Sequence, residues 1–282
     1  MADNNRIHWF PGHMMKTLRL IEADIRQVDA VAELVDARLP RSSRNPELAR
    51  LTRSKPRVLI LNKSDLADPA LTQRWLEYYR GEGFGAIAIQ SKDKSARAKC
   101  VNALCDAAKN VRRVSVGTPR VMVVGIPNVG KSTFINMLAG TTRAKAEDRP
   151  GVTRGKQWIS LPELELLDMP GVLWKKLEDQ EGALKLAFTG SIKDDVLDVE
   201  ELAVCLLDSI KNNYAAQLAD RFKMTEEQLA QSGYALLEAV AKNRGMLLGR
   251  GELNTERAAI TVLDELRGGK LGRITFEEPD MP

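Results

Sequence analysis

The stretch Val121-Met-Val-Val-Gly-Ile-Pro-Asn-Val-Gly-Lys-Ser132 (VMVVGIPNVGKS) places an apolar run directly before a glycine-containing loop. A helical pattern follows the loop and continues to about Leu138. Strand, Gly-x4-Gly-Lys-Ser loop and helix in this order form the context in which the motif binds phosphate. Successive backbone N–H groups make a nest for phosphate oxygens, and the helix N-terminus adds partial positive charge. The stretch therefore predicts a nucleotide-binding α/β domain.

The residue types in this loop predict how it binds a nucleotide. Gly130 permits a close approach of the backbone, and Lys131 is expected to reach the β- and γ-phosphates. The Ser132 hydroxyl is expected to ligate Mg²⁺. The predicted nucleotide-binding residues of the loop are Asn128, Val129, Gly130, Lys131, Ser132 and Thr133.

Two further motifs follow downstream. Asp168-Met-Pro-Gly171 ends the second strand of an expected hairpin over Gln157–Leu161 and Leu164–Leu167. We expect Asp168 to hold Mg²⁺ directly or through water, and the Gly171 N–H to contact the γ-phosphate. Thr153 lies between the loop and this motif at a distance typical of the switch I threonine, which would make it a further Mg²⁺ ligand. An ordinary turn threonine is the alternative.

The base-reading motif comes early in the chain. The stretch Arg57–Asp68 (RVLILNKSDLAD) is an apolar run that opens into Asn62-Lys63-Ser64-Asp65. This tetrapeptide is typical of guanine-binding loops, in which the aspartate faces the base and the asparagine and lysine brace the loop. After another expected strand, Ser91-Lys92 stands where backbone N–H groups contact the guanine O6. This loop usually reads Ser-Ala-Lys, whereas the chain has Ser91-Lys92-Asp93, so affinity for guanine is open to change while specificity is expected to hold.

The order of these motifs predicts the topology. Base loop, O6 loop, phosphate loop, switch I and switch II follow one another, which is the usual order of a GTPase domain cut after switch II and rejoined at its ends. Circular permutation is tolerated when termini lie close together on the surface. Further strands are expected at Val31–Val35, Val58–Leu61, Ala86–Ile89 and Val121–Val124. Strands that alternate with helices predict a mostly parallel sheet covered by helices on both faces.

After about residue 177 the strand pattern stops. Helical patterns cover Glu200–Lys211, Thr225–Lys242 and Thr255–Arg267, and Thr225 begins a capping box. We therefore predict a circularly permuted P-loop GTPase domain over residues 1–176, with an N-terminal helical segment over 1–28. A smaller all-α C-terminal domain is predicted over residues 177–282.

Composition and charge limit the kind of protein. The 282-residue chain has 28% charged residues, and no apolar run has the roughly 18 residues of a membrane span. The absence of a signal core and three cysteines without metal spacing predict a cytoplasmic protein with buried, reduced thiols. Residues 1–158 hold 28 Lys and Arg against 15 Asp and Glu, while residues 159–282 hold 14 against 23. Two basic runs, at residues 38–57 and 92–120, predict a polyanionic partner such as RNA.

Two more stretches carry a family resemblance. Trp9-Phe-Pro-Gly-His-Met14 lies near the start, and Val35-Asp-Ala-Arg-Leu-Pro40 follows the first strand. Together with the permuted motif order and the tail Leu266–Ile274, they resemble the circularly permuted ribosome-biogenesis GTPases of the RbgA (YlqF) type. The resemblance covers nearly the whole chain. It implies a cytosolic GTPase that acts late in large ribosomal subunit assembly, binds ribosomal RNA and is stimulated by the ribosomal particle. We expect it to be a monomer without a membrane partner.

The resemblance also implies two roles that the motifs alone do not. Val172 stands where Ras-like enzymes place the glutamine that orients the attacking water. In the resembled family the histidine of the N-terminal motif is proposed to act instead, which corresponds to His13; a structural histidine is the alternative. An asparagine at the position of Asn128 helps bind K⁺ in related GTPases, and a turn-stabilising asparagine is the alternative.

Two functions remain open at this point. The first is an RNA-activated GTPase switch for subunit assembly, with Mg²⁺ and K⁺ as cofactors. The second is a nucleotide-gated RNA-binding scaffold in which hydrolysis is incidental. Both predict slow intrinsic turnover, because an aliphatic residue at position 172 cannot orient water.

Overall fold

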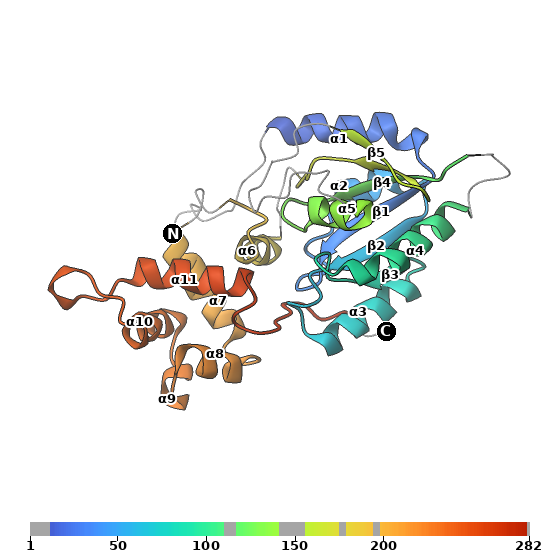
Figure 1. Ribbon diagram of the computed structural model, residues 1–282. Helices are drawn as coiled ribbons and strands as arrows, with labels where there is room; N and C mark the ends of the chain where they lie inside the picture. The colour runs from blue at the N-terminus through green and yellow to red at the C-terminus, as the bar shows by residue number, and fades with distance from the viewer. Residues whose placement is uncertain (1–11, 110–116, 141–155, 175–178, 194–197, 281–282) are drawn as a thin grey trace. The chain divides into compact units, whose positions relative to one another are not determined.

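The computed structural model describes residues 12–109, 117–140, 156–174, 179–193 and 198–280. The chain divides into two compact units, which are described separately (Figure 1). The sheet unit contains the described residues of His8–Glu178 together with those of Glu277–Pro282. The helical unit contains those of Asp179–Phe276.

The sheet unit is built on one six-stranded sheet. Its strand order is β3-β2-β1-β4-β6-β5, and every neighbouring pair is parallel except β5 and β6, which form an antiparallel hairpin. The predicted strands and the mostly parallel sheet are confirmed. The strands are β1 (Ala30–Asp36), β2 (Arg57–Asn62), β3 (Gly85–Ala88), β4 (Arg120–Gly125), β5 (Gln157–Ser160) and β6 (Glu165–Asp168).

The central strand β1 carries no polar face. All seven of its residues are buried, including two carboxylates, Glu33 and Asp36. A strand without alternation of polar and apolar residues is typical of a parallel sheet covered on both faces. Because a buried carboxylate is costly unless it is paired, both acidic side chains need cationic partners.

Helices cover both faces of this sheet. Right-handed crossovers from β1 to β2 and from β2 to β3 place α2 and α3 on one face, and the return from β3 to β4 places α4 on the other. The contacts agree, because α1 packs beside α2 and α4 packs beside α5 (Figure 1). Asn45 and Asp68 cap α2 and α3, each followed by a proline at the first helical position. These helices are α1 (Gly12–Asp24), α2 (Pro46–Thr52), α3 (Pro69–Gly81), α4 (Arg97–Lys109) and α5 (Lys131–Ala139), with 3-10 turns at Ile25–Gln27 and Lys94–Ala96.

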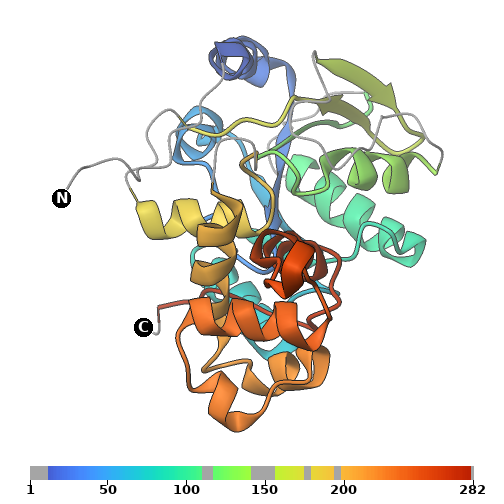
Figure 2. The same cartoon turned by 90° about the vertical axis from the view of Figure 1, so that its left-hand side faces the viewer.

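The helical unit is all-α, as predicted (Figure 2). The predicted capping box at Thr225 is present, but the single helix expected over residues 225–242 is wrong. The helix breaks because Ser232 caps a new one, its Oγ accepting from the Ala235 N–H at 3.4 Å. The helices are α6 (Gln180–Phe188), α7 (Val199–Ile210), α8 (Ala215–Phe222), α9 (Glu226–Leu229), α10 (Gly233–Asn243) and α11 (Thr255–Arg267), with a 3-10 turn at Gly249–Gly251.

Three details bear on the sequence predictions. Residues 277–280 belong to the sheet unit, although the sequence assigned all of 177–282 to the C-terminal domain. The cysteines are free thiols as predicted, but only Cys100 is buried, and burial raises its pKa to about 11. No helix in the described ranges is long and apolar enough to cross a membrane.

Candidate nucleotide-binding site

The predicted loops meet at one edge of the sheet. The phosphate loop follows β4, the base loop follows β2, Ser91 comes shortly after β3, and Asp168 ends β6. Because these strands are parallel neighbours in the sheet, their carboxyl ends open on the same edge. This edge is where open α/β sheets bind their ligands.

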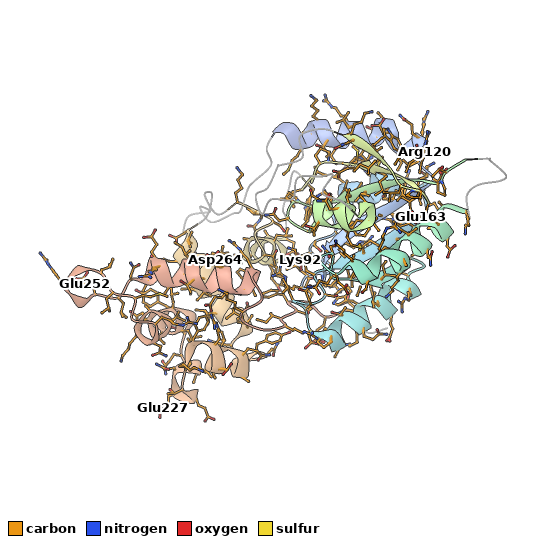
Figure 3. The ribbon with its side chains drawn as sticks, in the orientation of Figure 1. Lys92, Arg120, Glu163, Glu227, Glu252 and Asp264 are labelled. Atoms are coloured by element: carbon orange, nitrogen blue, oxygen red, sulfur yellow. The ribbon has the colours of Figure 1, made fainter. Side chains whose placement is uncertain are left out.

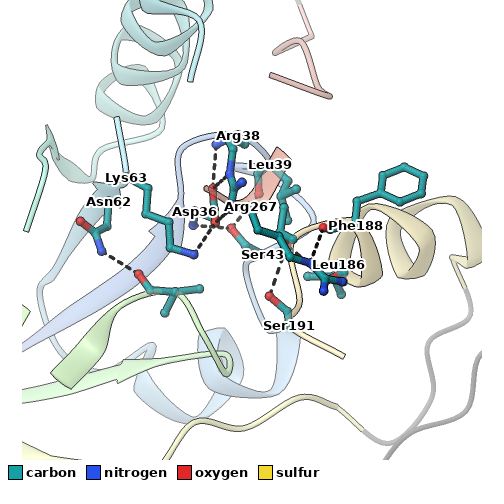
Figure 4. Close-up of polar contacts among 12 residues, drawn as sticks. Asp36, Arg38, Leu39, Ser43, Asn62, Lys63, Leu186, Phe188, Ser191 and Arg267 are labelled. Atoms are coloured by element: carbon teal, nitrogen blue, oxygen red, sulfur yellow. Dashed lines mark hydrogen bonds and ion pairs between the residues drawn. The ribbon is translucent and has the colours of Figure 1, made fainter. Parts of the chain in front are cut away.

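One buried side chain joins three of these loops. The Asn62 Nδ2 donates to the Val129 carbonyl of the phosphate loop at 2.7 Å (Figure 4). The Asn62 Oδ1 accepts from the Ser91 backbone N–H at 3.1 Å and from its hydroxyl at 2.7 Å. Asn62 is 2% exposed, so every one of these bonds is made away from water. The side chain therefore fixes the base loop, the O6 loop and the phosphate loop relative to one another.

The phosphate loop has the backbone that its glycines permit. Gly130 has a φ of 92°, and a Cβ at this position would lie 2.3 Å from the Asn62 Nδ2. Asn128 also has a positive φ of 59°, which is uncommon for a residue with a side chain. The loop then opens α5, on whose first turn Ser132 and Thr133 are half-buried. The predicted strand, loop and helix are thus present in the expected order.

Two charges are buried beside this loop. The Lys131 Nζ donates to the carbonyls of Ile126 at 2.9 Å and Gly125 at 3.3 Å. Burial lowers the pKa of Lys131 to about 8, against the opposing pull of Asp168. Burial likewise raises the pKa of Asp168 to about 6, and its Oδ1 has no hydrogen-bond partner among the described residues. The pair leaves a buried carboxylate oxygen available for a further cationic ligand.

The Asp168–Gly171 motif is packed against the phosphate loop. A Cβ on Gly171 would lie 2.8 Å from the Lys131 Nζ and 3.0 Å from the backbone of Pro127. Only a glycine fits this approach without displacing the loop. The structure therefore brings Gly171, Lys131 and Asp168 together.

The residue after Gly171 is fixed on both sides. The Val172 N–H donates to the Gly125 carbonyl at 3.3 Å, and its own carbonyl accepts from the Asn45 Nδ2 at 2.8 Å. The Leu173 N–H points to the Met14 sulfur at 3.4 Å. Val172 is 0% exposed, so it offers water no contact. Met14, in the first turn of α1, thus contacts the segment that follows Gly171.

Parts of the predicted site lie outside the described residues. His13 is in the first turn of α1, but its side chain is not among those described. Thr153 lies in the undescribed range 141–155. In the base loop Lys63, Ser64 and Asp65 are half-buried, and in the O6 loop Ser91 is buried. Lys92, which is labelled in Figure 3, is exposed.

Sequence reasoning gave Asp36 no chemical role beyond a family resemblance, and it counted Arg38 as part of a basic run. Both side chains are 1% exposed and form a salt bridge at 2.8 Å, and Asp36 also pairs with Lys63 of the base loop at 3.1 Å. The sequence does show an acid at the end of the first expected strand, Asp36, and a lysine just after the second, Lys63. Sequence alone does not show that neighbouring strands place the two side chains together.

The basic run at residues 38–57 is not a free surface. Its arginines other than Arg53 are paired within the sheet unit, among them Arg44 and Arg57 with the buried Glu33, and Arg41 with Asp280. Arg44 and Arg57 also stack on Phe84. Arg53 and Lys55 are the members without an ion pair among the described residues. Polyanion binding by this run stays a prediction, because Arg41, Arg50 and Arg53 are exposed although the first two pair with carboxylates.

The second basic run is more open. Lys92, Lys94 and Lys99 are exposed, whereas Arg97 pairs with Glu163 at 2.9 Å and Arg120 with Glu165 at 2.7 Å. In the helical unit, Arg267 is also engaged, because its guanidinium donates to the last carbonyls of α6. The exposed cations of the two units are therefore fewer than the sequence indicates.

Comparisons with known proteins agree with this site. The family model described as "50S ribosome-binding GTPase" matches residues 120–238. "Ribosome biogenesis GTPase A" of Bacillus cereus is 45% identical, with 97% of this chain and 94% of that protein covered. The relative of the same name in Thermotoga maritima is 30% identical, with 96% and 94% covered.

Solved structures are similar along nearly the full length. GNP-bound YlqF from T. maritima has a TM-score of 0.67 and 28% identity, with 94% of this chain and 99% of that chain covered. The GDP-bound form has a TM-score of 0.66 and 29% identity, with 93% and 99% covered. Fold, loops and relatives define a circularly permuted P-loop GTPase, which binds and hydrolyses guanine nucleotide. Within that class, the chain belongs to the ribosome biogenesis GTPase A family.

Proposed function

We propose that this GTPase binds the large ribosomal subunit or its precursor in the cytoplasm, and that the particle stimulates GTP hydrolysis late in assembly. The observation that carries the nucleotide part is the bridge made by Asn62, which joins base, O6 and phosphate loops. The ribosomal part is supported by the relatives named ribosome biogenesis GTPase A and by the family described as ribosome-binding.

The contacts support a separate role for each of the nucleotide-binding residues. Asp65 accepts from the guanine N1–H and exocyclic amine, while backbone N–H groups at Ser91 and Lys92 face O6. Lys131 exchanges its two loop carbonyls for β- and γ-phosphate oxygens, which stabilise its charge better than neutral acceptors do. Gly171 brings a backbone N–H close to the same phosphates, and its contact with Lys131 supports that role.

The residues present fit a magnesium ion. Mg²⁺ in nucleotide sites is held by one or two protein oxygens and by the phosphates, so a dedicated cage of side chains is not needed. The buried, unpartnered Oδ1 of Asp168 supplies one such oxygen, and Ser132 and Thr153 are the proposed hydroxyl ligands. When bound, Mg²⁺ neutralises charge that develops on the phosphates. Asn128 is proposed as a ligand of K⁺ near the same phosphates.

His13 is proposed to orient the attacking water. Val172 cannot do so because it is apolar and fully buried. Met14, the next residue to His13, contacts the backbone of Leu173, so the histidine's own segment lies beside the switch II motif. An imidazole titrates near pH 6.5 and can accept or donate a proton under physiological conditions.

Ribosomal RNA is the proposed polyanion. The exposed side chains of Lys92, Lys94 and Lys99 support a contact through the sheet unit. Lys270 and Arg273 are exposed in the helical unit and provide a second, smaller set of cations. Phosphate contacts of this kind position RNA without reading its sequence.

The test is steady-state GTP hydrolysis with and without purified large ribosomal subunits, in KCl and in NaCl. A particle-stimulated switch is expected to turn over slowly alone and much faster with subunits. Greater stimulation in KCl than in NaCl would support the role of Asn128. Subunit binding without any stimulation would instead identify a nucleotide-gated scaffold and contradict the proposal.

A further inference from the structure

Two buried charged side chains, Asp36 and Arg38, lie next to the base loop. Asp36 is the last residue of β1, and the parallel register places it opposite Asn62 at the end of β2. The next backbone N–H, from Ala37, donates to the Asn62 carbonyl at 2.8 Å. The chain that leaves β1 is thus bonded to the first residue of the base loop.

Both carboxylate oxygens of Asp36 are occupied (Figure 4). Its Oδ1 accepts from the Arg38 backbone N–H at 3.1 Å and from the Arg38 Nε at 2.9 Å. Its Oδ2 accepts from the Arg38 Nη2 at 2.8 Å and lies 3.1 Å from the Lys63 Nζ. The Asp36 backbone N–H donates to the Ser43 hydroxyl at 2.9 Å. Arg38 therefore orients the carboxylate, and Lys63 is the partner that belongs to another loop.

Lys63 has an unusual backbone that this contact helps to explain. Its φ is 59°, in the left-handed region, which is unfavourable for a residue with a side chain. Such a conformation persists where its surroundings fix it. The ion pair with Asp36 holds the end of the Lys63 side chain, and the Ser64 N–H is held by the Ile89 carbonyl at 3.1 Å. Asp65 follows immediately, so its direction depends on this turn.

Stability alone is a weak reason for such a cluster. A buried ion pair carries a desolvation cost that its attraction repays only in part, and apolar side chains often stabilise a core equally well. Burial by itself raises the pKa of Asp36, but the charges of Arg38 and Lys63 outweigh it and hold that pKa well below its usual range. The carboxylate is therefore a fixed negative charge at physiological pH, next to a loop that must point at a base.

We propose that Asp36, oriented by Arg38, is a positioning residue for the base loop. It holds Lys63 in its left-handed turn and so directs Asp65 toward the guanine amine. This inference rests on the proposed nucleotide-binding roles of Lys63 and Asp65. It assigns Asp36 an effect on guanine preference, which a residue that merely stabilises the fold would not have.

Glu33 provides a matched control. It lies on the same strand, is 2% exposed, and is paired with two arginines, Arg44 and Arg57, but it does not contact the base loop. Asp36→Asn and Glu33→Gln each remove one buried negative charge from β1. Equilibrium binding of GDP and of inosine diphosphate, which lacks the exocyclic amine, is measured for both variants and the parent.

Asp36→Asn is expected to weaken GDP binding about tenfold, equivalent to about 1.4 kcal/mol, and to reduce the preference for GDP over inosine diphosphate. Glu33→Gln is expected to leave that preference unchanged. A parental preference in Asp36→Asn, or an equal loss of preference in Glu33→Gln, would overturn the inference. Thermal unfolding of both variants shows whether they are folded under the binding conditions.

A double-mutant cycle tests whether Asp36 acts through Lys63. If it does, Asp36→Asn has little further effect on GDP binding in a Lys63→Ala background; additive losses would contradict the relay. Should Asp36→Asn not fold, Asp36→Glu takes its place in the same cycle, because it moves the charge by one methylene group. Asp65→Asn is measured in parallel. If it leaves GDP affinity intact, the proposed base site itself fails; if only Asp36 proves silent, this inference alone fails.

Discussion

Lys131 and Asp168 are the residues whose burial most affects their chemistry. Burial lowers the pKa of Lys131 and raises the pKa of Asp168, so it favours the neutral form of each group. Without a ligand the protein therefore holds a charge pair that neither the loop nor water fully stabilises. A nucleotide and its cation are the ligands that would relieve both groups at once. Sites organised for a ligand are commonly less stable without it.

This arrangement predicts a gain in stability from an inactivating change. The pKa of Asp168 rises from 3.8 to about 6 on folding, so its contribution to stability is fully present below pH 4 and is lost as pH rises to about 6. Asp168→Asn removes that loss. We expect a higher thermal midpoint than the parent at pH 7.5, by roughly 2–4 °C for each kcal/mol gained, a smaller advantage at pH 5, and no GTP turnover. An equal advantage at both pH values would contradict the burial of this charge.

His13 gives the second prediction at this scale. His13→Ala is expected to lower particle-stimulated turnover by about 10²–10⁴-fold, the usual effect of losing such a group, with nucleotide affinity and particle binding nearly intact. His8→Ala is the control and is expected to retain stimulation. Turnover is measured under saturating ribosomal subunits. Loss of stimulation through loss of particle binding would make His13 a docking residue.

Individual residues show where sequence reasoning succeeded and where it stopped. Asn62, Lys131, Asp168 and Gly171 were found because each belongs to a short motif with fixed spacing, and the structure brings them together. Arg38 was counted as part of a basic surface, yet it is 1% exposed. Burial of an arginine depends on a carboxylate that folding brings to it, and the motif spacing does not report that.

At the scale of elements, residues 277–280 form a segment that binds to the sheet unit. The Glu277 carboxylate accepts from the backbone N–H groups of Arg41, at 2.7 Å, and Ser42, at 3.2 Å, and from the Ser42 hydroxyl. The Trp75 indole N–H donates to the Glu277 carbonyl at 3.0 Å. Two successive N–H groups around an anion make a nest, here filled by the protein's own side chain.

Glu277 is therefore expected to stabilise the sheet unit. Glu277→Ala leaves two part-buried backbone N–H donors without their charged acceptor, at a cost of about 1–3 kcal/mol, which urea unfolding measures as a lower midpoint. Glu278→Ala is the matched control, because Glu278 is 64% exposed and pairs only at the surface with Arg74. Its effect is expected to stay below about 1 kcal/mol. Equal effects of the two changes would show that residues 277–280 are not anchored through Glu277.

The strands and helices also show what local sequence patterns predict and what they miss. The strands were predicted within about one residue because buried parallel strands are apolar runs ended by functional loops. The break between α9 and α10 was missed because the helical period continues through Ser232 and Gly233. A Cβ on Gly233 would lie 2.4 Å from the Val204 carbonyl of α7, so packing against a neighbouring helix explains a glycine that the periodicity leaves unexplained.

For the whole molecule, the order of the motifs predicted the sheet topology, whereas the net charge of each segment overstated the number of free cations at the surface. The order of motifs follows directly from the sequence, and the sheet topology confirms it. Charge per segment indicated a basic surface over residues 38–57, but Arg38, Arg44 and Arg57 of this run pair with the buried carboxylates of Asp36 and Glu33. The fold makes these ion pairs, so the net charge of a segment does not reveal them.

RNA binding is expected to follow the exposed cations instead. Affinity for ribosomal RNA falls with salt, with a slope that changes by about 0.7–0.9 for each phosphate contact removed. Reversal of Lys94 and Lys99 to glutamate is expected to flatten the slope more than reversal of Lys270 and Arg273, all four of which are exposed. Binding titrations over a range of KCl concentrations measure it. The opposite ranking would place the main RNA surface on the helical unit.

The most direct test of the whole account is the nucleotide specificity of Asp65→Asn, measured as hydrolysis of GTP and of xanthosine triphosphate with and without large ribosomal subunits. The base loop precedes the phosphate loop in the chain, yet both must serve one nucleotide. The account predicts that particle-stimulated turnover moves from GTP to xanthosine triphosphate, because the new amide matches the altered base. A variant that hydrolyses GTP as the parent does, and gains nothing with xanthosine triphosphate, would contradict it.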